Sequence, residues 1–289
     1  HGGAAYAAIL AQRTWTPPAM LAELPDPGGP VLAVARAPET QRRLEFAGRS
    51  WIVKSSGQVP FGPGPNLWSV SPRNVWGDAE GLHLRLVERD GLWTCAEVMS
   101  ESYIGYGRLR FEVDGAIDAM DPNVVFAGFF YSDQGDEADI EWSRWGDPSS
   151  PTNGQYVVQP DVVQPLSMAL GGATSTHEIL WREQGIDFAT WAGVTRPGAP
   201  PLASWTHAGD VPQPDFERVH FNLWLVDGAP PAGPVEVVIR SFESGSPSDV
   251  PARWGGSGSA QPARISMVAA RDWATVHLFP GDSYRNTAP

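Results

Sequence analysis

Three carboxylate residues, Glu137, Asp139 and Glu141, occupy alternate positions in the segment GDEADIEWSRWG, residues 135–146. Successive side chains of a β-strand point to opposite faces, so on a strand this spacing places all three acids on one face. The apolar residues that alternate with them, AxIxW, then share the other face and belong in a core. On a helix the acids would scatter around the axis, so the pattern favours a strand.

Such a row of acids suits acid–base chemistry at one bond. The Cα atoms of Glu137 and Glu141 are expected about 13 Å apart, at roughly 3.3 Å per residue. On a concave sheet their carboxyl groups can approach to about 5–6 Å, close to the separation of roughly 5–5.5 Å that retaining glycosidases use. Asp139 can hydrogen-bond one glutamate, and mutual repulsion keeps one group protonated near neutral pH. A solvated acidic face and a calcium site are the alternatives; the packed opposite face argues against both.

The surrounding sequence predicts short strands. Alternating or continuous apolar runs are separated by turn signals such as RDG, and helical stretches of ten or more residues are absent from this region. Two hairpins are expected, in GLHLRLVERDGLWTCAEVMS and in EILWREQGIDFATWAG, the latter turning around Gln184-Gly185. NVVFAGFFYS reads as a central strand covered on both faces, followed later by RVHFNLWLVDG and PVEVVIRSFE. The fold class predicted is all-β, a β-sandwich of the jelly-roll kind.

The chain divides into four predicted parts. Residues 1–43 form an N-terminal arm, partly irregular, and residues 44–242 form the β-jelly-roll domain. Residues 243–263 form a Gly/Ser/Pro-rich loop or linker. Residues 264–289 form a C-terminal extension that could add an edge strand.

Composition narrows the class of partner. The formal net charge is −13, and nucleic acid or an anionic membrane would require a basic surface instead. No apolar run is long enough to span a membrane, and the opening segment does not read as an intact signal peptide. Cys95 is the only cysteine, so no internal disulfide forms, and the 13 tryptophans exceed the needs of a core and favour carbohydrate stacking.

The motif Glu137-x-Asp139-x-Glu141 resembles the signature of glycoside hydrolase family 16, the laminarinase, lichenase and xyloglucan transglycosylase group. AEVMSESYIGYGRLRFEVDG, HEILWREQGIDFATWAG and VHFNLWL resemble further segments of that family in the same order. The resemblance implies two curved antiparallel sheets with a concave substrate cleft. By that resemblance Glu137 is the nucleophile, Glu141 the general acid/base and Asp139 the assisting acid, on an unbulged strand. Ala138 and Trp142 depart from the usual core pair and are interpreted as a compensating exchange of volume.

The expected function is a retaining endo-acting glycoside hydrolase that cleaves a neutral β-glucan or galactan by double displacement. The alternatives are a transglycosylase on the same substrates and a jelly roll that binds carbohydrate without cleaving it. No cofactor is expected to be required, although the family allows a structural calcium. We expect an extracellular or periplasmic monomer. The residues expected to contact substrate are His220, Asn222, Trp224, Trp145, Arg144, Asn66, Trp68, Trp76, Glu97 and Arg108.

Overall fold

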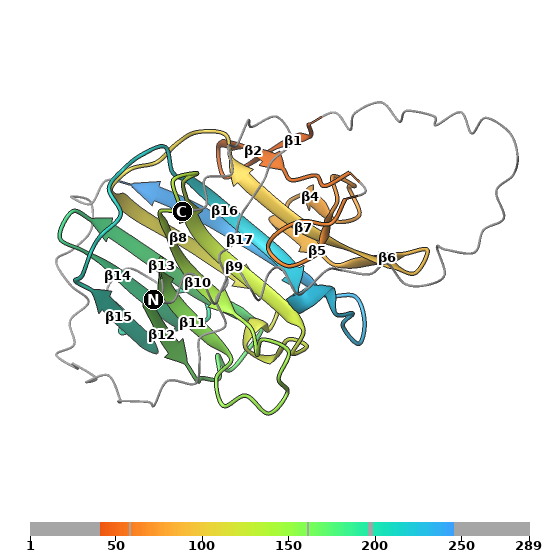
Figure 1. Ribbon diagram of the computed structural model, residues 1–289. Coiled ribbons are helices and arrows are strands. Elements are labelled where there is room, and N and C mark those ends of the chain that lie inside the picture. Colours follow the sequence, from red (N-terminus) through yellow and green to blue (C-terminus); the bar gives the residue numbers. More distant parts are fainter. Residues whose placement is uncertain (1–40, 58, 161, 196–198, 246–289) are drawn as a thin grey trace, which may run out of the picture. The chain divides into compact units, whose positions relative to one another are not determined.

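The computed structural model describes residues 41–57, 59–160, 162–195 and 199–245 (Figure 1). Most of the predicted N-terminal arm, nearly all of the predicted linker and the whole C-terminal extension lie outside the described residues. Two 3-10 turns, Ile117–Ala119 and Val226–Gly228, are the only helical elements in this part of the chain. None of the described helices is long and apolar enough to cross a membrane.

The first sheet carries ten strands and holds the three acids. Its main path runs β1-β2-β7-β16-β9-β10-β11-β12, with β3 and β6 pairing onto β7. All the pairings are antiparallel except that of β3 with β7. The strands are β1 (Arg43–Phe46), β2 (Arg49–Val53), β3 (Leu67–Trp68), β6 (Val87–Arg89), β7 (Leu92–Ser100), β9 (Val124–Tyr131), β10 (Glu137–Trp142), β11 (Gly154–Val158), β12 (Val162–Leu166) and β16 (Arg218–Leu225).

The second sheet has seven antiparallel strands in the order β15-β14-β13-β8-β17-β5-β4 and forms the other layer of the sandwich (Figure 1). Together the two layers confirm the predicted all-β jelly-roll sandwich. The strands are β4 (Val75–Gly77), β5 (Leu82–Arg85), β8 (Gly107–Asp114), β13 (Thr174–Arg182), β14 (Gly185–Ala192), β15 (Ala203–His207) and β17 (Glu236–Gly245). The last strand extends three residues beyond the predicted domain end at residue 242.

The core lies between the two sheets and is rich in aromatic rings. Phe221 of β16 meets Phe111 of β8 edge-on at 5.2 Å, and Phe130 of β9 stacks on Trp181 of β13 at 4.4 Å. Gly128 of β9 is required there, because a Cβ atom at this position would lie 2.6 Å from the ring of Phe111. The alternation predicted for the β8 and β16 segments therefore places their apolar residues in the shared core.

One predicted hairpin is different in the structure. Leu82, Leu84 and Leu86 were expected to pair with the strand that follows the RDG turn, but β5 belongs to the seven-stranded sheet. Only the short strand β6 pairs with β7, across the two-residue turn Asp90-Gly91. Both turn residues have positive φ, as a type I′ turn requires. The chain therefore changes sheets near Leu86, which a pattern of alternation cannot reveal.

Candidate active site

The strand β10 carries the three acids on one face, as their spacing predicts. Its register with β9 and with β11 runs without interruption over the paired residues, so the strand is unbulged. Ala138, Ile140 and Trp142 are fully buried on the core side. Because successive side chains of a strand point to opposite faces, Glu137, Asp139 and Glu141 lie together on the other face.

Trp142 is accommodated by a glycine on the neighbouring strand. Gly154 of β11 pairs with Trp142, and a Cβ atom at that position would lie 3.1 Å from the indole and 2.9 Å from the carbonyl oxygen of Glu141. Ala138 pairs with Phe130 and Val158, which fill the space beside its small side chain. The unusual core pair of this strand is therefore supported by partners in other strands.

The electrostatics of the acids follow from their burial. Glu137 is 6% exposed and Asp139 is 3% exposed. Burial, together with the charges of Glu137 and Glu141, raises the pKa of Asp139 well above its usual range. Burial also raises the pKa of Glu137, whereas the hydrogen bond with Asp139 and the positive charge of Lys54 lower it. Asp139 therefore holds its proton more strongly than Glu137 does, and a Glu137 side chain that has lost its proton accepts the hydrogen bond from Asp139.

Glu141 has a different partner. Gln155 Nε2 of β11 donates a 2.6 Å hydrogen bond to Glu141 Oε2, and the two residues are paired in the strand register. Burial raises the pKa of Glu141 to about 7, and the hydrogen bond from Gln155 opposes this shift. One oxygen is engaged by the amide, which leaves the other to carry a proton. The two glutamates are thus held in different environments, as two different catalytic roles require.

A buried charged network lies on the same face, beyond β9. Lys54, which follows β2, forms a 2.7 Å ion pair with Glu97 of β7, and His220 Nδ1 of β16 lies 3.1 Å from the second oxygen of Glu97. The His220 ring stacks on Phe129 at 4.9 Å, and Phe129 pairs with Asp139. Burial lowers the pKa of His220. Glu97, which was predicted to contact substrate, lies on this face, and its fully buried side chain is engaged by Lys54 and His220.

Asn222 and Trp224 continue the acid face along β16, as predicted. Asn222 lies in the lateral row that also contains Ala127 and Glu141. Its Oδ1 atom is buried and has no hydrogen-bond partner among the described residues. Trp224 is nearly buried and meets Trp145 edge-on, with 6.1 Å between ring centroids. A buried acceptor without a partner on this face points to a donor supplied from outside, such as water or a ligand hydroxyl.

The remaining predicted contact residues are not gathered at the acids. Asn66 is buried and donates to the carbonyl oxygens of Pro63 and Leu225, so it holds a loop in place. Arg144 donates to the carbonyl oxygen of Ser150 and lines a cavity of about 370 Å³ with Asp118, outside the acid row. Trp68 is buried beneath Lys54, whose Nζ lies 3.9 Å from its ring centroid.

Two of the predicted contacts lie in the other layer. Trp76 of β4 stacks on His83 at 4.4 Å, and Arg108 of β8 forms an exposed ion pair with Glu243. Both strands belong to the seven-stranded sheet, so the structure places these side chains outside the acid site. Two further residues of the site were missed. Lys54 and Gln155 follow no sequence motif, and only strand pairing brings them to Glu97 and Glu141.

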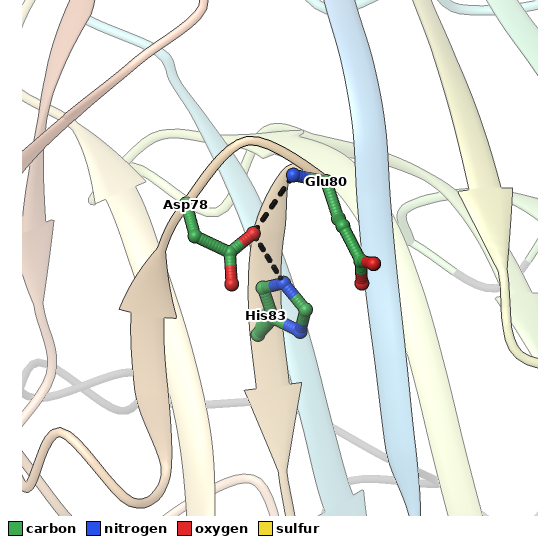
Figure 2. A group of neighbouring side chains, drawn as sticks. All are labelled: Asp78, Glu80 and His83. Carbon is green, nitrogen blue, oxygen red and sulfur yellow. Dashed lines mark hydrogen bonds and ion pairs between the residues drawn. The ribbon is translucent and has the colours of Figure 1, made fainter.

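A calcium ion was the one metal that the family resemblance allowed. Among the described residues, Asp78, Glu80 and His83 form a group whose ligand atoms lie within 4.8 Å of one another. Figure 2 shows Asp78 Oδ1 accepting a hydrogen bond from the Glu80 backbone amide and forming a second hydrogen bond with His83 Nε2. Glu236 contacts the other ring nitrogen of His83. Calcium prefers six to eight oxygen ligands, so a group centred on an engaged imidazole does not fit it.

Several solved structures share this fold, although the sequence matches no known family model. No protein-family model and no curated protein matches the sequence. Among solved structures, a β-1,3-glucanase from Mycobacterium marinum aligns with a TM-score of 0.52 and 19% identity, covering 67% of this chain and 90% of that one. A family 16 glycosyl hydrolase from Mycobacterium smegmatis aligns with a TM-score of 0.51 and 18% identity, covering 67% and 91%. The chain has the family 16 glycoside hydrolase fold.

A third solved structure has this fold but is not described as an active glucanase. It is described as an immunostimulatory antigen and pseudo β-1,3-glucanase of Mycobacterium tuberculosis, and it aligns with a TM-score of 0.51 and 19% identity over 67% of this chain and 90% of that one. The family 16 fold therefore occurs both in glucanases and in a protein described as a pseudo-glucanase. The fold alone therefore does not decide activity, which depends on the side chains of this chain.

Proposed function

We propose that this protein is a retaining, endo-acting glycoside hydrolase whose substrate is a neutral β-linked polysaccharide, a β-glucan or a galactan. One observation carries the proposal: Glu137, Asp139 and Glu141 share one face of an unbulged strand, and Asp139 and Gln155 give the two glutamates different hydrogen-bond partners. A polysaccharide is met outside the cytoplasm, so an extracellular or periplasmic location belongs to the same proposal.

The proposed reaction has two displacements. Glu137 attacks the anomeric carbon, and the glycosidic bond breaks while Glu141 gives its proton to the leaving oxygen. Asp139 keeps its proton on the hydrogen bond to Glu137, which orients the nucleophile. Glu141, now a carboxylate, takes a proton from water. The resulting hydroxide oxygen attacks the same carbon and expels Glu137, so the anomeric configuration is retained.

The site also offers a contact for the sugar itself. The Oδ1 atom of Asn222 is buried and without a partner among the described residues, and it faces the same side as Glu141. A sugar hydroxyl would supply the missing donor. The negative charge of the Glu137 carboxylate and of the whole chain disfavours a sulfated or uronate polymer, which supports a neutral substrate.

A non-catalytic carbohydrate-binding protein is the second candidate, because one structure of the same fold is described as a pseudo-glucanase. The complete acid row favours the enzyme. Glu137 and Asp139 are buried and Glu141 is partly buried, and all three have raised pKa values. Such carboxyl groups destabilise the native state, and a protein that only binds sugar gains nothing from them.

The test is cleavage of laminarin, lichenan, xyloglucan and agarose, followed by new reducing ends and by product length. We expect mid-chain cleavage of at least one polymer, a first product of retained configuration by proton NMR, and a loss of at least 1,000-fold in Glu137→Gln with an unchanged fold. Products longer than an oligosaccharide substrate would indicate transglycosylation. Binding of a polymer by the parent protein without any bond cleavage would favour the second candidate.

A further inference from the structure

Two aromatic rings stand exposed at the end of the acid-bearing sheet. Tyr103, in the connection after β7, is 53% exposed, and Phe216, just before β16, is 70% exposed. The rings meet edge-on with 5.3 Å between their centroids. Large aromatic side chains usually supply buried area, so a pair that is kept together in solvent requires another explanation.

The pair adjoins the row of the proposed nucleophile. Arg218 pairs with Tyr131 of β9, and Tyr131 pairs with Glu137, so these three residues share a lateral row and a face. The guanidinium of Arg218 lies 4.4 Å from the centroid of the Tyr103 ring, and its Nη2 donates to the Tyr103 hydroxyl. Arg218 thereby connects the aromatic pair to the Glu137 end of the acid face.

The two connections that carry the rings are held by hydrogen bonds, and the rings themselves do not pack into the core. The Ile104 amide donates a 2.8 Å hydrogen bond to the carbonyl of Glu217, which links the two connections. The buried Glu217 carboxylate accepts from the Asp215 amide. Phe216 itself has a φ of 69°, a left-handed conformation that is unfavourable for a bulky residue and costs of the order of 1–3 kcal/mol. Glycine would relieve this strain, so the phenyl ring is not there for stability.

We propose that Tyr103 and Phe216 form a stacking platform for one neutral hexopyranose unit of a polysaccharide that extends past the Glu137 end of the acid face. This assignment rests on the proposed function for the identity of the polymer. Two rings at 70° to each other offer one aromatic face with a ring edge beside it, which suits a single sugar ring, whereas a stable protein interface needs roughly 800 Å² on each partner.

The experiment measures binding apart from cleavage by placing each variant in the Glu137→Gln background. Affinity gel electrophoresis with laminarin, lichenan, xyloglucan and agarose reports the dissociation constant. Tyr103→Ala and Phe216→Ala should each weaken binding about three- to tenfold, the worth of one aromatic contact. Leu92→Ala and Leu202→Ala remove comparably exposed apolar side chains elsewhere and should change nothing. Phe216→Gly should weaken binding without lowering the melting temperature, with Ala47→Gly as the control for relief of positive φ alone.

The outcomes separate this inference from the proposed enzyme. Unchanged affinity in both alanine variants overturns the platform even if the parent protein cleaves a polymer. If the parent protein binds a polymer but cleaves none, and the alanine variants bind that polymer more weakly, the result supports the platform and rejects the enzyme. A parent protein that none of the four glycans retards overturns the platform, because the rings are already exposed. Size-exclusion chromatography in which the alanine variants convert a dimer to a monomer also overturns it, since the patch is then an interface between two copies.

Discussion

Lys54 Nζ lies 2.7 Å from Glu97 Oε2, and both side chains are completely shielded from solvent. The ammonium also donates to the carbonyl oxygen of Gly62 and lies over the Trp68 ring, while the second oxygen of Glu97 engages His220. This pair is the charged centre of the face that holds the acids. Its charges act on Glu137 in opposite directions, since Glu97 raises the pKa of Glu137 and Lys54 lowers it.

Removing one member of this pair should destabilise the protein strongly. Lys54→Met leaves a buried carboxylate without its partner, which typically costs about 3–5 kcal/mol. Chemical denaturation should show this loss, and Lys54→Met/Glu97→Gln should recover at least half of it. The glutamine keeps an oxygen for His220, so that contact is preserved. Losses that simply add in the double variant would show that the two residues do not interact.

Stability should depend on pH in a direction set by the buried acids. Burial raises the pKa of Glu137, Asp139 and Glu141 above their values in the unfolded chain, about 4. At pH values between the unfolded-state and native-state pKa values, the native state binds more protons than the unfolded chain, so the free energy of unfolding falls as pH rises. The Glu137→Gln variant has no ionisable group at position 137. Its melting temperature should exceed that of the parent by an amount that grows from pH 5 to pH 9, reaching at least about 3 °C.

A constant offset between the two melting curves at all pH values would contradict this explanation. Asp78→Asn is the matched control, because burial is not the main influence on that exposed carboxyl and its pKa is lowered, chiefly by a hydrogen bond from the Glu80 backbone. A lowered pKa contributes stability above the unfolded value that is lost on acidification. The control should therefore show its deficit at neutral pH and lose it only in acid.

Gln155 should set the alkaline limit of activity. Glu141 must carry a proton to act as the acid, and its pKa of about 7 predicts that kcat/KM falls above neutral pH. The hydrogen bond from Gln155 lowers that pKa, so Gln155→Leu should move the alkaline limb to higher pH while reducing the maximal rate about tenfold. A lower rate with an unmoved limb would mean that Gln155 only positions the strand.

Asn222 should contribute to substrate affinity without contributing to stability. Its buried Oδ1 atom has no partner among the described residues, so removing it costs the fold no hydrogen bond made by that atom. Asn222→Ala should raise KM about three- to tenfold for the polymer that is cleaved, with a melting temperature within about 2 °C of the parent. A large loss of stability with unchanged KM would assign Asn222 to the fold alone.

Gly154 should be intolerant of a side chain. A Cβ atom there would lie 2.9 Å from the Glu141 carbonyl oxygen and 3.1 Å from the Trp142 ring, so Gly154→Ala should cost about 1–3 kcal/mol and lower activity by shifting Glu141. Trp142→Phe in the same chain should restore part of the loss. Gly172→Ala is the control, because that position has open space around it. Equal stability of both alanine variants would refute the packing argument.

The sequence alone determined the acid row and its orientation. A period of two is a local property of a strand, so Glu137, Asp139 and Glu141 had to share a face once Ala138 and Trp142 belonged to the core. The same reasoning predicted the all-β sandwich and the face of β16 that carries Asn222. These inferences hold because alternation is set by backbone geometry and does not depend on which strands become neighbours.

Tertiary structure decided everything that depends on pairing between distant strands. The sequence did not indicate that Lys54 would form an ion pair with Glu97 or that Gln155 would donate a hydrogen bond to Glu141. It also did not indicate that Trp76 and Arg108 would lie in the other sheet. Register and strand order come from loop closure and from packing across the whole sandwich, which are non-local. The shared face of the acids could therefore be predicted from the seven residues DEADIEW, whereas their hydrogen-bond partners and their protonation depend on the complete fold.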